Sequence, residues 1–167
     1  GFYSRIIGNS DTNTSATGAV DLNNNIFLTG CFKNQLNFAS DFGSSDIRTP
    51  HNSGNNFDDV FITKIDVNGN FKWTKIIGGS GNDCGKNITT DNTGNIYITG
   101  YFSNSVNFAE DFNGSDFITA SSTTNIFVSK INSDGSYGWT FTLNTAFEPI
   151  KILDKNDFIY FTSLLSG

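Results

Sequence analysis

The sequence predicts an all-β protein made of four-stranded antiparallel sheets that pack face to face. Three observations lead to this prediction: a composition rich in strand and turn formers, two long segments that are near copies of each other, and strands with bulky apolar residues on both faces. A sheet that is apolar on both sides needs a cover on both sides, so the two copies are expected to cover one another.

The composition describes a chain with a bulky core and many tight turns. Of 167 residues, 37% are hydrophobic and 14% aromatic, and 17 are Phe. Asn, Gly and Ser are abundant and favour turns, whereas Thr, Ile, Val, Phe and Tyr favour strands. This mixture predicts short strands joined by tight turns.

Charge and hydropathy exclude two classes of partner. The net charge of -6 argues against nucleic acid, whose recognition needs clustered Lys and Arg. No stretch approaches the roughly 18 to 20 apolar residues of a membrane helix, so no membrane insertion is expected. The first residues lack the charged and apolar regions of a signal peptide, which suggests a processed or internal piece.

Internal repetition is the strongest pattern in the sequence. A shift of 70 residues aligns residues 25–49 with 95–119, and 14 of these 25 positions are identical. A shift of 66 residues aligns 60–65 and Trp73-Thr74 with 126–131 and Trp139-Thr140. The change of shift implies a length difference in a loop near residues 50–54, where it costs little stability.

Each repeat is expected to contain four strands. In the second copy they lie near residues 86–90, 95–103, 125–132 and 137–143, and turns at 91–95 and 132–136 join the outer pairs. Residues 96–99 and 60–65 place bulky side chains on both faces. Because no segment has a helical period, other sheets must supply the cover, and stacked four-stranded units of this length are typical of β-propeller blades.

The repeat unit resembles a known family. Residues 94–102 (GNIYITGYF), 106–108 (VNF), 125–131 (NIFVSKI), Asp134-Gly135 and Trp139 look like the seven-bladed β-propeller repeat (SBBP) of bacterial and archaeal secreted and cell-surface proteins. The resemblance implies export and a scaffold role without an assigned reaction. Cys84 stands where the family tends to have an aromatic residue, and residues 109–111 replace a common acidic-proline turn.

The repeats divide the chain into four parts. Residues 1–7 are expected to be the last strand of a preceding blade, 8–77 and 78–143 two complete blades, and 144–167 the first strands of a further blade. About eleven strands cannot close a ring, because propellers need about 4 to 8 blades. We expect a segment of a longer chain, or else copies that complete a ring or fibre, since exposed sheet edges favour association.

Few residues have the pattern of a reactive or metal-binding site. His51 is the single histidine and is expected in a surface loop without a catalytic role. Carboxylates that repeat between the copies could hold Ca²⁺, although Asx-type capping of a tight turn is the favoured interpretation. No other cofactor is expected. The weak calcium candidates are Asp41, Asp46, Glu110, Asp111 and Asp116.

For the repeated aromatic residues and the two cysteines, a structural role is favoured over a role in binding. Tyr3, Trp73 and Trp139 occupy one equivalent position and are expected to pack between blades, with stacking on sugars as the alternative. Cys31 and Cys84 lie near one rim of neighbouring blades; either they form a disulfide or, as favoured, they are free thiols. Candidate glycosylation sequons begin at Asn13, Asn87 and Asn113.

Two functions follow as expectations. The first is an extracellular or cell-surface structural or adhesive module, not an enzyme, whose partners are other blades of a longer chain or further copies of itself. The second is a ligand-binding propeller that takes carbohydrate. Catalysis is disfavoured, because the repeats offer only carboxylates and hydroxyl groups in turns.

Overall fold

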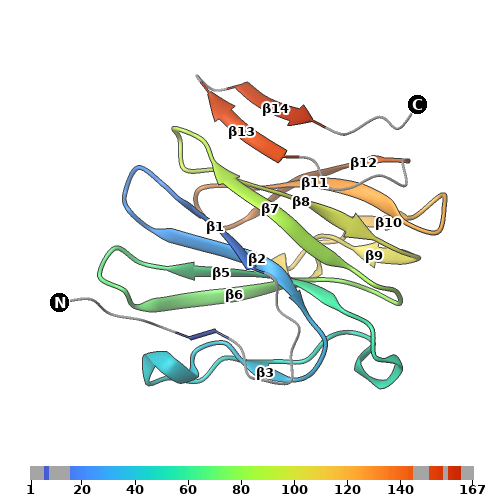
Figure 1. Cartoon of the computed structure of the whole chain (residues 1–167), viewed down its shortest axis with the longest axis horizontal. Coiled ribbons are helices and arrows are strands. Elements are labelled where there is room, and N and C mark those ends of the chain that lie inside the picture. The colour runs from blue at the N-terminus through green and yellow to red at the C-terminus, as the bar shows by residue number, and fades with distance from the viewer. Residues whose placement is uncertain (1–5, 8–15, 145–150, 156–157, 163–167) are drawn as a thin grey trace.

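The computed structural model describes residues 6–7, 16–144, 151–155 and 158–162 (Figure 1). Its described regular structure is almost entirely strand, in two four-stranded antiparallel sheets and three short hairpins. This confirms the predicted all-β class and the propeller-blade architecture. Most of the expected preceding strand, residues 1–5, lies outside the described residues.

The first sheet, called blade 1, has the strand order β1-β2-β5-β6. Its strands are β1 (Ala16–Val20), β2 (Ile26–Phe32), β5 (Asp59–Ile65) and β6 (Phe71–Ile77). The sheet lies within the range 8–77 expected for a blade.

The second sheet, blade 2, repeats this order as β7-β8-β11-β12. Its strands are β7 (Cys84–Thr90), β8 (Ile96–Phe102), β11 (Asn125–Ile131) and β12 (Tyr137–Leu143). These bounds agree within a few residues with the four strands expected from the sequence, because strand-forming residues between turns marked each one.

The connection between the second and third strands is more ordered than the loop expected there. In blade 1 it holds a hairpin of β3 (Leu36–Asn37) and β4 (Ile47–Arg48) around a 3₁₀ turn, η1 (Ser40–Phe42), and then η2 (Ser53–Asn55). Blade 2 has β9 (Ser105–Asn107), η3 (Glu110–Phe112) and β10 (Phe117–Thr119). Strands of two or three residues are too short for a readable period.

A further hairpin continues the stack. Strands β13 (Lys151–Lys155) and β14 (Phe158–Thr162) pair with each other, and β13 packs on β7 and β8 of blade 2. In the same way β7 packs on β1 and β2 of blade 1. Figure 1 shows this succession, with the β13–β14 hairpin on the side of blade 2 away from blade 1.

The largest apolar cluster joins the two blades. Phe27, Val60, Ile62 and Ile77 of blade 1 pack with buried residues of blade 2. The partners from blade 2 are Ile88, Ile96, Ile98, Phe102, Val106, Phe108, Phe127 and Ile131. Side chains from both faces of blade 1 are buried, because Phe32, Phe38 and Phe61 form a second cluster on its other face.

The tight turns follow the repeat. Gly69, Gly94 and Gly135 each adopt a positive φ in the hairpin turns, and Asn24 does so at the equivalent position in blade 1. Asn tolerates the left-handed conformation better than other residues with a side chain, which explains why this replacement keeps the hairpin.

Gly100 in β8 provides a test of the stacking. A methyl group on Gly100 would lie 2.0 Å from the Cys84 carbonyl oxygen and 2.8 Å from the Phe127 ring. Gly100→Ala should therefore lower the free energy of unfolding by about 1–3 kcal/mol, as overpacked cores do. Gly54→Ala is the matched control, because no atom lies within 4 Å of its added methyl group. Equal urea midpoints for the two variants would contradict this packing.

Candidate functional site

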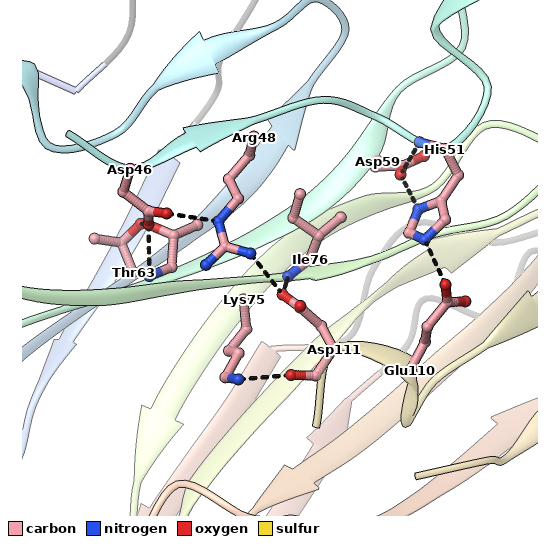
Figure 2. Close-up of polar contacts among 10 residues, drawn as sticks. Asp46, Arg48, His51, Asp59, Thr63, Lys75, Ile76, Glu110 and Asp111 are labelled. Carbon is pink, nitrogen blue, oxygen red and sulfur yellow. Dashed lines mark hydrogen bonds and ion pairs between the residues drawn. The ribbon is translucent and has the colours of Figure 1, made fainter. Parts of the chain in front are cut away.

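The boundary between the two blades gathers most of the polar side chains that the sequence marked as candidates. The η3 turn of blade 2 lies beside β6, the outer strand of blade 1 (Figure 2). Figure 2 shows two places where hydrogen bonds and ion pairs cross this boundary, one around Asp111 and one around His51.

Asp111 connects η3 to the edge of β6. Its Oδ2 accepts a hydrogen bond from the Ile76 amide at 2.8 Å and lies 3.5 Å from Arg48 Nη1. Lys75 Nζ donates to the Asp111 carbonyl oxygen at 2.5 Å and lies over the Phe112 ring. A charged acceptor on an outward-facing amide is a strong hydrogen bond and also blocks the strand edge.

The same contact occurs one repeat earlier. Asp41, which aligns with Asp111, accepts a hydrogen bond from the Ile6 amide at 2.8 Å, and Ile6 aligns with Ile76. The repeated carboxylate thus bonds the backbone of the segment that precedes its own blade. This role differs from the turn capping expected from the sequence.

The remaining calcium candidates also face protein donors or cations. Asp46 accepts from Arg48 Nε at 2.7 Å and from the Thr74 amide at 3.2 Å, and Asp116 accepts from the Tyr137 hydroxyl. The turns themselves are capped by Asn37 and Asn107, whose Oδ1 atoms accept hydrogen bonds from backbone N–H groups.

Glu110, the last calcium candidate, has its carboxylate near the His51 ring. In the described part of the chain, no three His, Cys, Asp or Glu residues form a group suited to a metal ion.

His51 lies between two carboxylates, a partnership that the sequence did not reveal. Its Nδ1 lies 2.6 Å from Asp59 Oδ2, and its backbone N–H donates to the same oxygen at 2.8 Å. Its Nε2 lies 3.6 Å from Oε1 of Glu110, across the blade boundary. The hydrogen bond to Asp59 raises the pKa of His51 above its usual 6.5, against the opposing effect of burial.

Buried Asp83 and half-buried Asp58 lie close to this pair in the chain and the fold. Asp83, in the link between the blades, accepts hydrogen bonds from the Gly79 and Ser103 amides at 2.9 and 3.1 Å. Burial, together with the charge of Asp59, raises the pKa of Asp83 to about 7. One oxygen of Asp59 and one of Asp58 are buried without a hydrogen-bond partner. The blade boundary therefore holds two groups, His51 and Asp83, whose pKa values are raised in the folded protein.

A disulfide joins the blades. Cys31 near the end of β2 is bonded to Cys84 at the start of β7, 53 positions further along the sequence. The sequence left this bond open and favoured free thiols, an interpretation that was wrong: the two Cα atoms lie 4.7 Å apart, within the usual range for a disulfide.

The aromatic candidates pack within and between blades. Trp73 lies 6.3 Å from the Phe27 ring and contacts the cluster that joins the blades. Trp139 lies 6.3 Å from the Tyr97 ring in the equivalent arrangement, but 41% of its surface is exposed. Tyr3 lies outside the described residues.

The three sequons have different surroundings. Asn13 lies outside the described residues. Asn87 is a half-buried member of β7, whereas Asn113 is exposed and left-handed at the end of η3. Of the two described positions, Asn113 is the one whose side chain is accessible to a modifying enzyme.

The disulfide gives a test of the blade junction. Cys31→Ala with Cys84→Ala should lower the free energy of unfolding by about 2–4 kcal/mol, because a long loop in the unfolded chain is no longer closed. The wild type in reducing agent should match this variant in urea unfolding, and reducing agent should leave the variant unchanged. Native wild-type protein that reacts fully with a thiol reagent would contradict the bond.

The raised pKa values of His51 and Asp83 predict how the stability of the folded protein changes with pH. Asp83 has a raised pKa in the folded protein, so the folded state binds the proton more tightly and stability falls as pH rises from about 4 to 7. The stabilisation from His51 is complete below pH 6.5 and is lost as pH rises through its raised pKa.

Urea unfolding from pH 4 to 9 measures both effects. Asp83→Asn should gain stability relative to wild type as pH rises from 4 to 7, and His51→Gln should remove the decline above pH 6.5. Parallel pH profiles for wild type and Asp83→Asn would show that Asp83 titrates normally. Asp134→Asn, an exposed turn carboxylate, is the control.

No helix in the described residues has the length and apolar character to cross a membrane.

Among curated proteins, an uncharacterised WD repeat-containing protein, L264 of Acanthamoeba polyphaga mimivirus, is 31% identical over 135 residues. The match covers 77% of this chain and 10% of that protein, so the chain spans about a tenth of its relative. The family described as Beta-propeller repeat (SBBP) matches residues 72–109, from β6 through β9. This match confirms the resemblance seen in the sequence at residues 72–109, and the two four-stranded sheets have the architecture of β-propeller blades.

Proposed function

We propose that this chain is a structural or adhesive module of an extracellular or cell-surface protein, which acts by contacting other protein surfaces and not by catalysis. The observation that carries the proposal is the blade boundary, where one blade binds the next through apolar packing, repeated carboxylate contacts and a disulfide. The same surfaces, presented to another chain, are suited to assembly.

The disulfide supports the proposed location. Cys31–Cys84 joins two sheets, and such bonds persist in secreted and surface proteins, whereas cytosolic thiols are kept reduced. The WD repeat-containing name of the mimivirus relative is in keeping with a repeat scaffold. It says nothing of a reaction.

The chemistry of the described residues favours binding over catalysis. The single histidine faces carboxylates with both ring nitrogens, and Asp59, its closer partner, has no exposed surface. A general base needs a free nitrogen within reach of a substrate proton. Asp46 and Asp111 are similarly bonded to backbone amides and to Arg48. A calcium ion at these turns would have to displace those bonds. We therefore propose no resident cofactor.

Carbohydrate binding is the second candidate function, and the exposure of Trp139 favours it. Trp139 and Phe141, which is 54% exposed, lie on the same face of β12 and offer aromatic surface that could stack on a sugar ring.

A paired binding assay separates the two functions. The folded, oxidised chain should bind an immobilised copy of itself in biolayer interferometry and should give no selective signal on a glycan array. Selective glycan binding that is lost in Trp139→Ala and kept in Trp73→Ala would instead support the carbohydrate-binding function and overturn the proposed one.

A further inference from the structure

The turn that follows η3 presents a complete acceptor triplet for N-linked glycosylation. Asn113-Gly114-Ser115 has the required Asn, a middle residue that is not proline, and a hydroxyl residue at the third position. All three residues are exposed, although Asp111 of the same turn is bonded to blade 1. Neither the side-chain amide of Asn113 nor the Ser115 hydroxyl has a hydrogen-bond partner among the described residues. Both groups that a transferase must reach are therefore accessible.

The backbone at Asn113 has a conformation that both repeats share. Asn113 follows η3 with φ 61°, and its N–H donates to the Glu110 carbonyl oxygen at 3.1 Å. Gly43 holds the same position in blade 1, with φ 73°. Gly and Asn are the residues that adopt this left-handed conformation most readily, so the exchange keeps the turn. It also completes the triplet, because Ser115 has an identical counterpart, Ser45, in blade 1.

The exposure of this site does not depend on which blade comes next. Asn113 is exposed with the preceding blade in place, and Gly43 shows what a following blade covers, because blade 2 packs on blade 1. Gly43 remains exposed, and a methyl group on it would have no atom within 4 Å beyond its chain neighbours. A further blade stacked on blade 2 in the same way would leave Asn113 uncovered.

The other described triplet is unsuited to a bulky modification. Asn87 is half-buried in β7 and already has an interaction partner. It stands opposite Thr99, which has no exposed surface, and β7 packs on β1 and β2 of blade 1. An oligosaccharide at Asn87 would disturb the junction between the blades, whereas one at Asn113 meets only solvent.

We propose that Asn113 is an N-glycosylation site of this module. The inference rests on the proposed extracellular location, because N-linked oligosaccharides mark the surface loops of secreted proteins. The side-chain nitrogen of Asn113 forms a bond to the anomeric carbon of an oligosaccharide carried on a lipid diphosphate. The bond from that carbon to the diphosphate oxygen breaks, the lipid diphosphate leaves, and one amide proton passes to a base of the oligosaccharyltransferase.

The glycan and the assembly surfaces are separate in this arrangement. Phe112 packs against the apolar cluster that joins the blades, and Asp111 bonds the edge of β6. Asn113 takes part in neither contact and is exposed. Glycosylation should therefore leave the stacking of the blades and the binding of one copy to another unchanged.

Secretion of the whole chain from eukaryotic cells tests the site. The chain is expressed behind a cleavable signal peptide, and the secreted protein is treated with an enzyme that releases N-linked glycans in water labelled with heavy oxygen. Peptide mass spectrometry should find a core oligosaccharide on Asn113 before release and a labelled aspartate at that position afterwards. The label separates a released glycan from spontaneous deamidation of Asn113-Gly114.

Matched variants connect the modification to the triplet. Asn113→Gln and Ser115→Ala should each lose this glycan, the second although the acceptor Asn is kept. Asn87→Gln is the control and should have the same glycan content as wild type. Gly43→Asn should gain one glycan at the equivalent turn of blade 1, where Ser45 supplies the hydroxyl. Near-ultraviolet circular dichroism should match wild type for Ser115→Ala and Asn113→Gln.

The outcomes separate this inference from the proposed function. Secreted wild type without a glycan on Asn113, or Ser115→Ala that keeps it, overturns the site and leaves the assembly function to be judged by the binding of one copy to another. Glycosylated wild type and unglycosylated Asn113→Gln should bind an immobilised copy equally well. If both fail to bind while the glycan is present in wild type, the assembly function is overturned and the site stands.

Discussion

Both four-stranded sheets are apolar on both faces, and the rest of the structure depends on covering both. In β5 and β11, five consecutive positions on alternating faces are buried. Such strands cannot face water on either side, so a blade is stable only between neighbours. Stacking of blades is therefore a requirement of folding before it is a means of binding.

Polar contacts at the boundary give the stack its alignment. Apolar packing has little directional preference, whereas the bond from the Ile76 amide to Asp111 fixes one edge strand against the next turn. The disulfide fixes the opposite region, where β2 meets β7. Between them lie His51 and Asp83, whose raised pKa values make the stability of the junction sensitive to pH.

The elements that could be predicted from the sequence are the strands and turns that occur in both repeats. Strand β8 could be predicted because its strand-forming residues lie next to a turn and its counterpart β2 lies 70 residues earlier. The His51–Asp59 pair had no such signal, since the position of Asp59 is taken in blade 2 by Asn125, which bonds Ser121 and Ser122. A side-chain pair that occurs in one blade and not in the other can be found only from the folded structure.

Other features were hidden because sequence spacing does not give distance. Cys31 and Cys84 are far apart in sequence, and only the stacking of β2 on β7 brings them together. The role of Asp111 was hidden for the same reason: a turn-forming sequence suggests a local hydrogen bond, but its carboxylate bonds a strand 35 residues away. Local sequence patterns predict the strands and turns within one blade, but they do not predict the contacts that a blade makes with the next one.

Hydrogen exchange under increasing denaturant tests the mutual dependence of the blades most directly. Peptides from β5 in blade 1 and β11 in blade 2 should lose amide protection together, at one denaturant concentration and with one opening free energy, because each covers a face of the other's sheet. If β5 kept its protection while β11 exchanged freely, each blade would be stable alone, and the central requirement of a double-sided cover would be wrong.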